Sequence, residues 1–92
     1  MLKIKTTAQF NKDYKLAKRR GYKSIRLEKA IRLLANEYPL PIQYHDHVLR
    51  DTARYSNVRE CHIQPDWLLI YRIEKELEIL RLIRTGTHSD LF

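Results

Sequence analysis

Residues 60–71, with the sequence ECHIQPDWLLIY, decide the fold because they predict two strands and the turn that joins them. The second half, WLLIY at 67–71, is the longest uninterrupted apolar run in the chain and is typical of a central strand buried on both faces. The first half alternates in character, as a half-buried strand does. Pro65 breaks strand pairing between the halves, so His62 and Asp66 are expected at a turn on the rim of the sheet.

The residues before this stretch predict one strand and two helices. The segment LKIKT at 2–6 alternates apolar and basic side chains and is interpreted as a strand. A first helix is expected from a Thr cap to about residue 20, with a stop at Gly21. A second helix, capped by Ser24, carries an apolar stripe that extends to residue 38.

From residue 44 onward the hydrophobic period changes to two. It predicts a short strand or extended segment at 45–50, followed by strands at 57–63, 66–73 and 77–84. The order β-α-α-β-β-β indicates an α+β domain in which two N-terminal helices pack on one face of a twisted antiparallel sheet. The opposite face is expected to hold a site, and residues 1–92 are interpreted as one domain.

The charge balance favours an anionic partner. Lys and Arg number 18 against 11 acidic residues, a formal net charge of +7, which suits nucleic acid or an acidic protein; a merely soluble basic surface is the alternative. No apolar run approaches the roughly 18 residues of a membrane span, and the N-terminus lacks signal-peptide features. The single cysteine, Cys61, excludes an internal disulfide, so a cytoplasmic protein without membrane partners is expected.

All four histidines, His45, His47, His62 and His88, fall in the strand-rich half of the chain. Histidine suits general acid–base work because its ordinary pKa lies near neutrality. The segments HDH, HIQPD and RTGTH follow or precede predicted strands, and in a meander their ends can meet at one rim. Each histidine taken singly also has a structural or solvated interpretation.

Three kinds of chemistry compete for these residues. A zinc site could use His45 and His47, which share a face two residues apart, but the spacing matches no common zinc signature and no metal is expected. Cys61 alternates with the core residues and is interpreted as a small hydrophobe. Metal-free RNA cleavage needs a base, an acid, a phosphate-binding cation and a stacking aromatic, and the chain offers all four.

Three blocks in the second half, HDHVL, RECHIQPDWLLIY and RTGTHSDLF, in this order, resemble the YafQ branch of the RelE-type toxins of bacterial toxin–antitoxin systems. The helical half, with FNKDYKLAKRRG and PLP, also fits, so the resemblance covers nearly the whole chain. It implies a RelE-like microbial RNase fold and a small basic endoribonuclease, an mRNA interferase that needs no metal or cofactor. It further implies that messenger RNA is cut in the ribosomal A site, leaving a 2′,3′-cyclic phosphate.

The resemblance also implies partners and site residues. A cognate acidic antitoxin is expected to neutralise the toxin, and operator DNA is expected to be bound only through the antitoxin complex. The implied catalytic residues are His47, His62, Asp66, Arg84 and His88. His88 is expected to act as a general acid or base and Arg84 as the phosphate clamp, with Asp66 and either His47 or His62 orienting the reacting groups or accepting the proton.

Expected RNA-binding residues are Trp67, Phe92, Arg59, Arg81, Lys12, Lys15 and Arg19. Trp67 also has a core interpretation at the start of its strand. The three cations of the first helix are candidates for contacting ribosomal RNA, although a solvated helix face explains them equally well. Val48 departs from the family, which commonly has Pro there, and the C-terminal carboxylate at Phe92 lies close to the expected site.

Two other functions remain open at this point. A ParE-like inhibitor of DNA gyrase would act on the same scaffold without cutting nucleic acid, and a non-catalytic nucleic-acid-binding module would keep only the basic surface. Neither needs histidines paired with aspartate at strand ends, so the sequence favours the nuclease.

Overall fold

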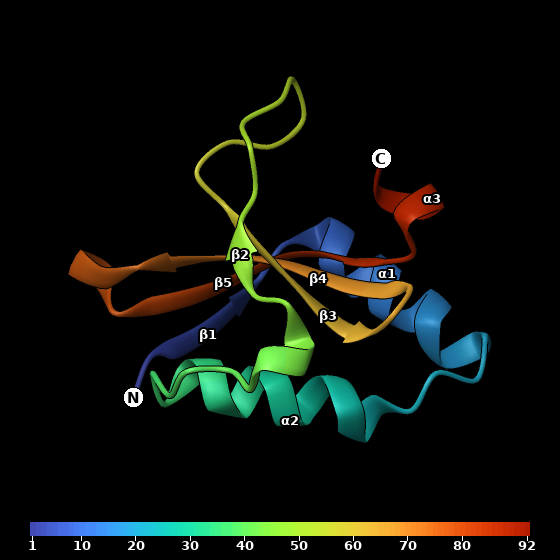
Figure 1. Ribbon diagram of the computed structural model, residues 1–92, viewed down its shortest axis with the longest axis horizontal. Helices are drawn as coiled ribbons and strands as arrows, with labels where there is room; N and C mark the ends of the chain where they lie inside the picture. Colours follow the sequence, from blue (N-terminus) through green and yellow to red (C-terminus); the bar gives the residue numbers. More distant parts are fainter.

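The computed structural model describes all 92 residues and contains one five-stranded sheet in the order β1-β5-β4-β3-β2 (Figure 1). Two long helices and one short C-terminal helix accompany it. The elements are β1 (Lys3–Thr6), α1 (Ala8–Arg19), α2 (Ser24–Ala35), β2 (His47–Val48), β3 (Arg59–Gln64), β4 (Trp67–Glu74), β5 (Ile79–Gly86) and α3 (His88–Leu91), with 3-10 turns at Ile42–Tyr44 and Lys75–Leu77.

The predicted α+β class is confirmed, with one difference in the sheet. β1 pairs in parallel with β5, whereas the other neighbouring strands are antiparallel, so the sheet is mixed. An alternating pattern marks a strand but does not encode the direction of its partner. The extended segment expected at 45–50 forms only two paired residues, His47 and Val48.

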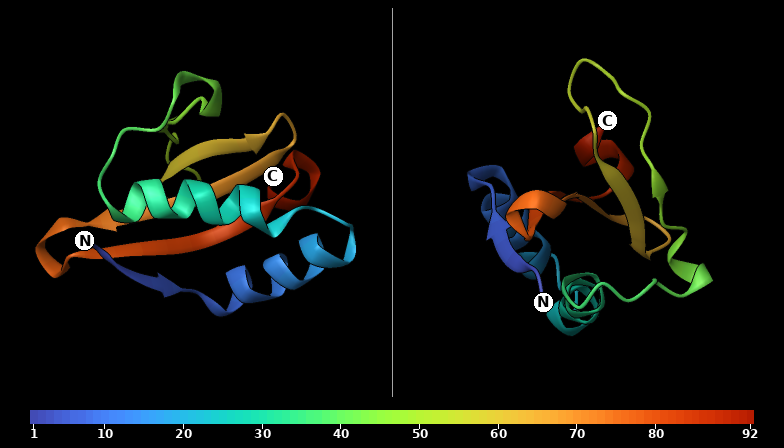
Figure 2. Two further views of the ribbon diagram at one scale, coloured as in Figure 1. Left: turned by 90° about the horizontal axis from the view of Figure 1, so that it is seen from below. Right: turned by 90° about the vertical axis from the view of Figure 1, so that its left-hand side faces the viewer.

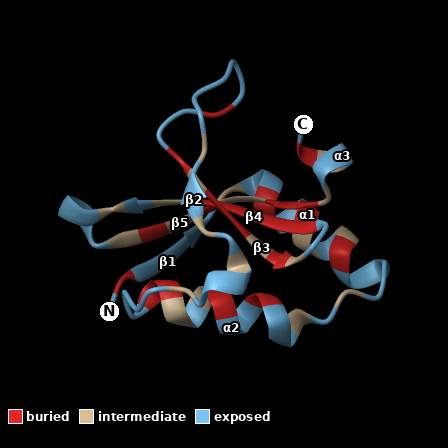
Figure 3. Cartoon of the chain, in the orientation of Figure 1, coloured by how far each residue is buried: buried red, intermediate tan, exposed pale blue.

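The apolar run in β4 is the centre of the core, as predicted. Residues 67–71 are each at most 1% exposed, and β4 hydrogen-bonds to β3 on one side and β5 on the other. Figure 3 shows β4 coloured as buried. Trp67, Leu69 and Tyr71 belong to the cluster on the helix side of the sheet, whereas Leu68 and Ile70 belong to a smaller cluster on the opposite side.

The two long helices lie on the same side of the sheet, and α1 packs against β5 (Figure 2). The opposite side is not fully open, because Tyr55, Val58 and Leu91 cover Leu68 and Ile70 there. These three residues come from the loop before β3 and from α3. The free part of that face therefore lies toward β2 and β3.

Helix boundaries follow local capping. The Thr7 side chain accepts a hydrogen bond from the Phe10 backbone N–H at 2.9 Å, and Gly21 adopts a left-handed φ of 85° after α1, as predicted. The prediction for α2 is wrong at both ends: Lys23 occupies the cap position without a side-chain hydrogen bond, and the helix ends at Ala35. Glu37 adopts a left-handed φ of 60° shortly after the end of α2, so the chain turns away before it reaches Pro39 and Pro41.

Neither α1 nor α2, each 12 residues long, has the length and apolar character that crossing a bilayer requires.

Candidate active site

A row of imidazole rings crosses the sheet face opposite α1 and α2. The ring centroids of His47 and His62 are 6.5 Å apart, and those of His62 and His88 are 5.8 Å apart. His45 lies beside this row, 5.4 Å from His62. The polar segments at 45–47, 62–66 and 84–88 thus meet at one rim. We call His45, His47, His62 and His88 the histidine cluster.

The strand register places the cluster. His47 on β2 is paired with Glu60 on β3, so both side chains share a face with His62 two residues further on. Gln64 pairs with Trp67, which leaves Pro65 and Asp66 as the two turn residues between β3 and β4. This is the turn that the sequence predicts at Pro65.

His88 of the cluster forms the closest polar pair at this rim, with Asp66. The carboxylate Oδ1 of Asp66 accepts the backbone N–H of His88 at 2.9 Å and contacts its ring Nδ1 at 2.6 Å. These two hydrogen bonds, the backbone one first, lower the pKa of Asp66. An ionised carboxylate only accepts, so Nδ1 of His88 carries the proton, and Nε2 is the ring nitrogen left to exchange a proton with a ligand.

Glu60 joins the other two rings of the row. It is only 5% exposed, and its Oε1 lies 3.5 Å from Nε2 of both His47 and His62. His47 also donates Nδ1–H to the carbonyl oxygen of His45 at 2.7 Å. The buried carboxylate and this carbonyl therefore restrict how the rings can turn.

Glu60 is not singled out from the sequence, and His45 is considered among the four histidines but left out of the expected catalytic set. Glu60 has the same alternation phase as His62, so the strand pattern contained a signal for it. His45 sits in the left-handed region with a φ of 48°, which turns its ring toward His62. No pattern of apolar residues marks such a turn in advance.

The short helix that carries His88 is braced from three directions. Its Thr87 and Asp90 form a reciprocal capping box, in which the Asp90 Oδ2 accepts the Thr87 N–H at 3.0 Å. Arg20, at the end of α1, forms a forked pair with Asp90 at 2.6 and 3.3 Å. The hydroxyl of Tyr55 donates to the Leu91 carbonyl at 2.9 Å. α3 therefore holds His88 in place although it has only four residues.

We predict that Asp90→Asn makes the protein less stable at neutral pH and that the difference shrinks progressively as pH falls below about 4. The hydrogen bonds from Arg20, then Thr87, hold the pKa of Asp90 well below its usual range. A lowered folded-state pKa contributes stability above about pH 4, the unfolded value, and that stability is lost as pH falls through the folded value. Loss of the cap and ion pair is expected to cost about 1 kcal/mol at pH 7.

Urea unfolding of both proteins at a series of pH values from 7 down to about 2 measures how this difference changes. Glu76→Gln is the matched control, because Glu76 is exposed and forms no ion pair. An Asp90→Asn effect that does not shrink at all as pH falls from 7 to about 2 would contradict the electrostatic account.

Arg84 is bound to a carboxylate within the chain rather than presented as a free cation, and its expected role as a phosphate clamp stays a prediction. Its Nε and Nη2 atoms donate to the two carboxylate oxygens of Asp13 at 3.0 and 2.9 Å. The Asp13 hydrogen bond raises the pKa of Arg84, and Asp13 is itself buried. Only Nη1 is not bonded to Asp13, so the fork braces β5 against α1.

Trp67 is a core residue, which corrects its assignment to RNA binding. It is 1% exposed, its ring packs on Tyr22 at a centroid distance of 4.9 Å, and its Nε1 donates to the Thr85 hydroxyl at 2.9 Å. A side chain so enclosed offers no face on which a base can stack.

The remaining predicted RNA-binding residues lie outside the histidine cluster. Arg59 pairs with Asp46 and Arg81 pairs with Glu74, so both charges are already matched. Phe92 is 51% exposed with its ring edge-on to Tyr55, one helical turn beyond His88. The three exposed cations of α1 that complete the set are Lys12, Lys15 and Arg19.

Cys61 lies in the helix-side core, where burial raises the pKa of its thiol, in keeping with the predicted structural role. Despite the four imidazoles, no three side chains of His, Cys, Asp or Glu are arranged to hold a metal ion.

Comparison with known proteins shows that this chain is similar to bacterial toxins. Residues 2–92 match the family described as "Bacterial toxin of type II toxin-antitoxin system, YafQ". The chain is 41% identical over 90 residues to the mRNA interferase toxin YafQ of Escherichia coli K12, covering 97% of this chain and 94% of that protein. Among solved structures, a metal-bound toxin from Helicobacter pylori superposes with a TM-score of 0.93 at 42% identity over the full length of both chains. The toxin of the E. coli DinJ–YafQ complex gives a TM-score of 0.89 at 40% identity, covering 100% of this chain and 99% of that one.

Proposed function

Because the chain belongs to the YafQ toxins of bacterial type II toxin–antitoxin systems, we propose that it is an mRNA interferase whose histidine cluster cleaves the RNA by general acid–base chemistry. The observation that best supports general acid–base chemistry is the Asp66–His88 pair. Asp66 fixes the His88 ring through Nδ1 and leaves Nε2 free for proton transfer. The centroid of this ring lies 5.8 Å from that of the next imidazole, His62.

The reaction needs two proton transfers at one phosphodiester. One group removes the proton of the ribose 2′-OH, whose oxygen then attacks phosphorus. The bond from phosphorus to the 5′-oxygen breaks, and a second group protonates that oxygen. His88 and His62 are close enough to serve the two oxygens of a single linkage, and the products are a 2′,3′-cyclic phosphate and a 5′-hydroxyl.

The other residues of the site act by position. Glu60 and the His45 carbonyl hold His47 and His62 on the sheet face, so the rings need little reorganisation when RNA binds. Phe92 has an exposed ring one turn beyond His88 and is the aromatic available for stacking on a base near the cleaved bond.

The partners follow from the family and from charge. A structural neighbour is the E. coli DinJ–YafQ complex, and we propose that an acidic antitoxin likewise covers this net +7 chain and mediates any contact with operator DNA. The exposed cations Lys12, Lys15 and Arg19 on α1 are proposed to contact ribosomal RNA while messenger RNA is cut in the A site of the cytoplasmic ribosome.

A reconstituted translation reaction tests the proposal. Purified toxin is added to ribosomes translating a defined message, and primer extension is expected to reveal new 5′ ends inside the reading frame that carry a 5′-hydroxyl. The same message without ribosomes is the control for translation dependence. No cuts at any toxin concentration would favour a non-catalytic binding module, and inhibition of gyrase supercoiling at the same concentrations would favour the ParE-like alternative.

A further inference from the structure

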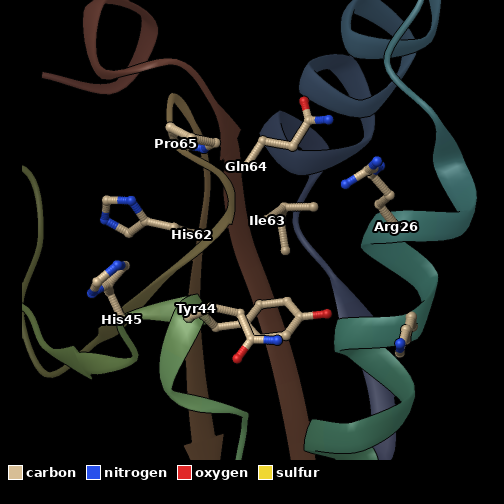
Figure 4. A pocket seen from close by; sticks show the side chains of 9 residues that line it. Arg26, Tyr44, His45, His62, Ile63, Gln64 and Pro65 are labelled. Atoms are coloured by element: carbon tan, nitrogen blue, oxygen red, sulfur yellow. The ribbon is translucent and has the colours of Figure 1, made fainter.

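A groove of about 880 Å³ opens directly beside the histidine cluster (Figure 4). α2 forms one wall, and the 3-10 turn at Ile42–Tyr44 with His45 and the end of β3 form the other. The lining residues that matter here are Arg26, Lys29, Tyr44, His45, His62 and Gln64. In Figure 4, Arg26 extends from α2 toward Ile63 and Gln64, while His45 and His62 lie on the far side of the groove.

The groove is lined by unmatched positive charge. Arg26 and Lys29 are exposed and take part in no ion pair or side-chain hydrogen bond, and none of the nine lining residues is acidic. By contrast, Arg20, Arg59 and Arg84 all face carboxylates within the chain. Two free cations without a neighbouring carboxylate favour an anionic ligand.

The residues that line the groove favour RNA over a protein segment as its ligand. Only two of the nine residues are hydrophobic, whereas the core of a protein–protein interface is enriched in aromatic and apolar side chains. The amide of Gln64 offers both a donor and an acceptor, which suits the edge of a base. The volume lies within the range of roughly 300–1,000 Å³ that encloses drug-sized ligands, so the groove has room for about one or two nucleotides.

His62 connects the groove to the reacting centre, because it lines the groove and also contacts His88 in the cluster. We propose that the groove is a subsite for the nucleotides adjoining the cleaved bond, with Arg26 and Lys29 binding backbone phosphates and Gln64 contacting a base. The proposal rests on the proposed function for its ligand. It adds a binding site on α2 that no sequence pattern had singled out.

Binding to a non-cleavable RNA tests the groove independently of catalysis. The probe is a fluorescent single-stranded oligoribonucleotide with 2′-O-methyl groups, and anisotropy gives the Kd. Replacing both cations (Arg26→Ala with Lys29→Ala) is expected to raise the Kd about 10- to 100-fold, since each removes a charge-assisted bond to phosphate. The slope of log K against log salt should become shallower by about 1.4, or 0.7 per lost phosphate contact.

The matched control is Lys3→Ala with Lys5→Ala, which removes the same charge from exposed positions on β1, at the opposite edge of the sheet. Its Kd is expected to stay within about twofold of the wild-type value, because net charge alone acts weakly at a distance. The conservative pair Arg26→Lys with Lys29→Arg should keep most of the affinity.

Three results would overturn the proposal: equal weakening by the groove and β1 variants, no weakening by either, or a groove variant that loses affinity for the antitoxin while keeping affinity for RNA. Cleavage on ribosomes tests the proposed function separately from the groove. The groove variant is expected to need about 10- to 100-fold more toxin than the wild type to reach half-maximal cutting, in line with its weaker RNA binding. If wild type never cuts, the proposed function fails, whereas the oligonucleotide comparison still decides the groove.

Discussion

Replacing His88 with Ala is expected to lower the rate of messenger RNA cleavage by about 10²–10⁴-fold, the usual contribution of one positioned acid or base. The ring is exposed at the start of α3, and it is the only imidazole whose Nδ1 is fixed by a carboxylate. Because the side chain adds nothing to the core, the unfolding midpoint should hardly change. Primer extension on a translated message and thermal unfolding followed by circular dichroism measure the two effects.

Controls separate the ring of His88 from the helix that carries it. Ser89→Ala alters the next exposed residue of α3 and should leave cleavage intact. Asp66→Asn keeps the shape of the turn but removes the ionised acceptor that fixes the His88 tautomer, so a loss of up to about 10⁴-fold is expected, as for a group that orients a catalytic imidazole. Full cleavage by both His88→Ala and Asp66→Ala would rule out this mechanism.

Trp67→Ala is expected to cost about 3–5 kcal/mol of folding free energy, the usual range for truncating a buried Trp. The residue is 1% exposed, packs on Tyr22 and donates to Thr85, so its removal leaves a cavity and a hydroxyl without its donor. For a domain of this size each kcal/mol lowers the melting temperature by roughly 4–8 °C, so a fall of more than about 12 °C is predicted. Thermal and urea unfolding measure the loss.

Two aromatic variants show whether this effect belongs to the core or to RNA binding. Trp67→Phe keeps most of the buried ring but loses the Nε1–H donor, so a cost of about 1 kcal/mol and normal cleavage per folded molecule are expected. Phe92→Ala removes an exposed ring, so stability should be nearly unchanged while RNA affinity falls. A Trp67→Ala protein with a wild-type melting temperature and weakened RNA binding would return Trp67 to the binding surface.

The ion pair between Arg84 and Asp13 shows that a sequence motif does not reveal which partner a side chain meets in the folded protein. The RTGTH segment suggested a free guanidinium beside His88, yet the fork of Arg84 binds a carboxylate 71 positions away. Asp13 also accepts the backbone N–H of Thr85 at 3.2 Å, so one buried carboxylate fastens the end of β5 to α1. Removing one partner of such a pair leaves the other charge buried and unpaired. Arg84 therefore contributes to the position of α3 through the strand that leads into it.

The placement of the histidine cluster could be predicted because it depends on local features. Strand periodicity puts His62 on the face opposite Cys61, and Pro65 forces a turn that carries Asp66 to the rim. The helix that begins at His88 was not expected from the sequence, although Thr87 and Asp90 form the capping box that starts it. The groove beside the cluster had no such signal, because its cations lie on α2, far from the strand-end motifs.

The sequence by itself determined the α+β class, the central strand at 67–71, the turn at Pro65 and Asp66, and the gathering of histidines at one rim. Each of these follows from side-chain periodicity or from the backbone limits of proline and glycine, which act over a few residues. Only the tertiary structure decided that β1 joins β5 in parallel, that Trp67 faces the core, that Arg84 pairs with Asp13, and that Arg26 and Lys29 face His62 across a groove. These outcomes depend on which distant partner satisfies a charge, a donor or a strand edge, and that choice is made by packing across the whole chain.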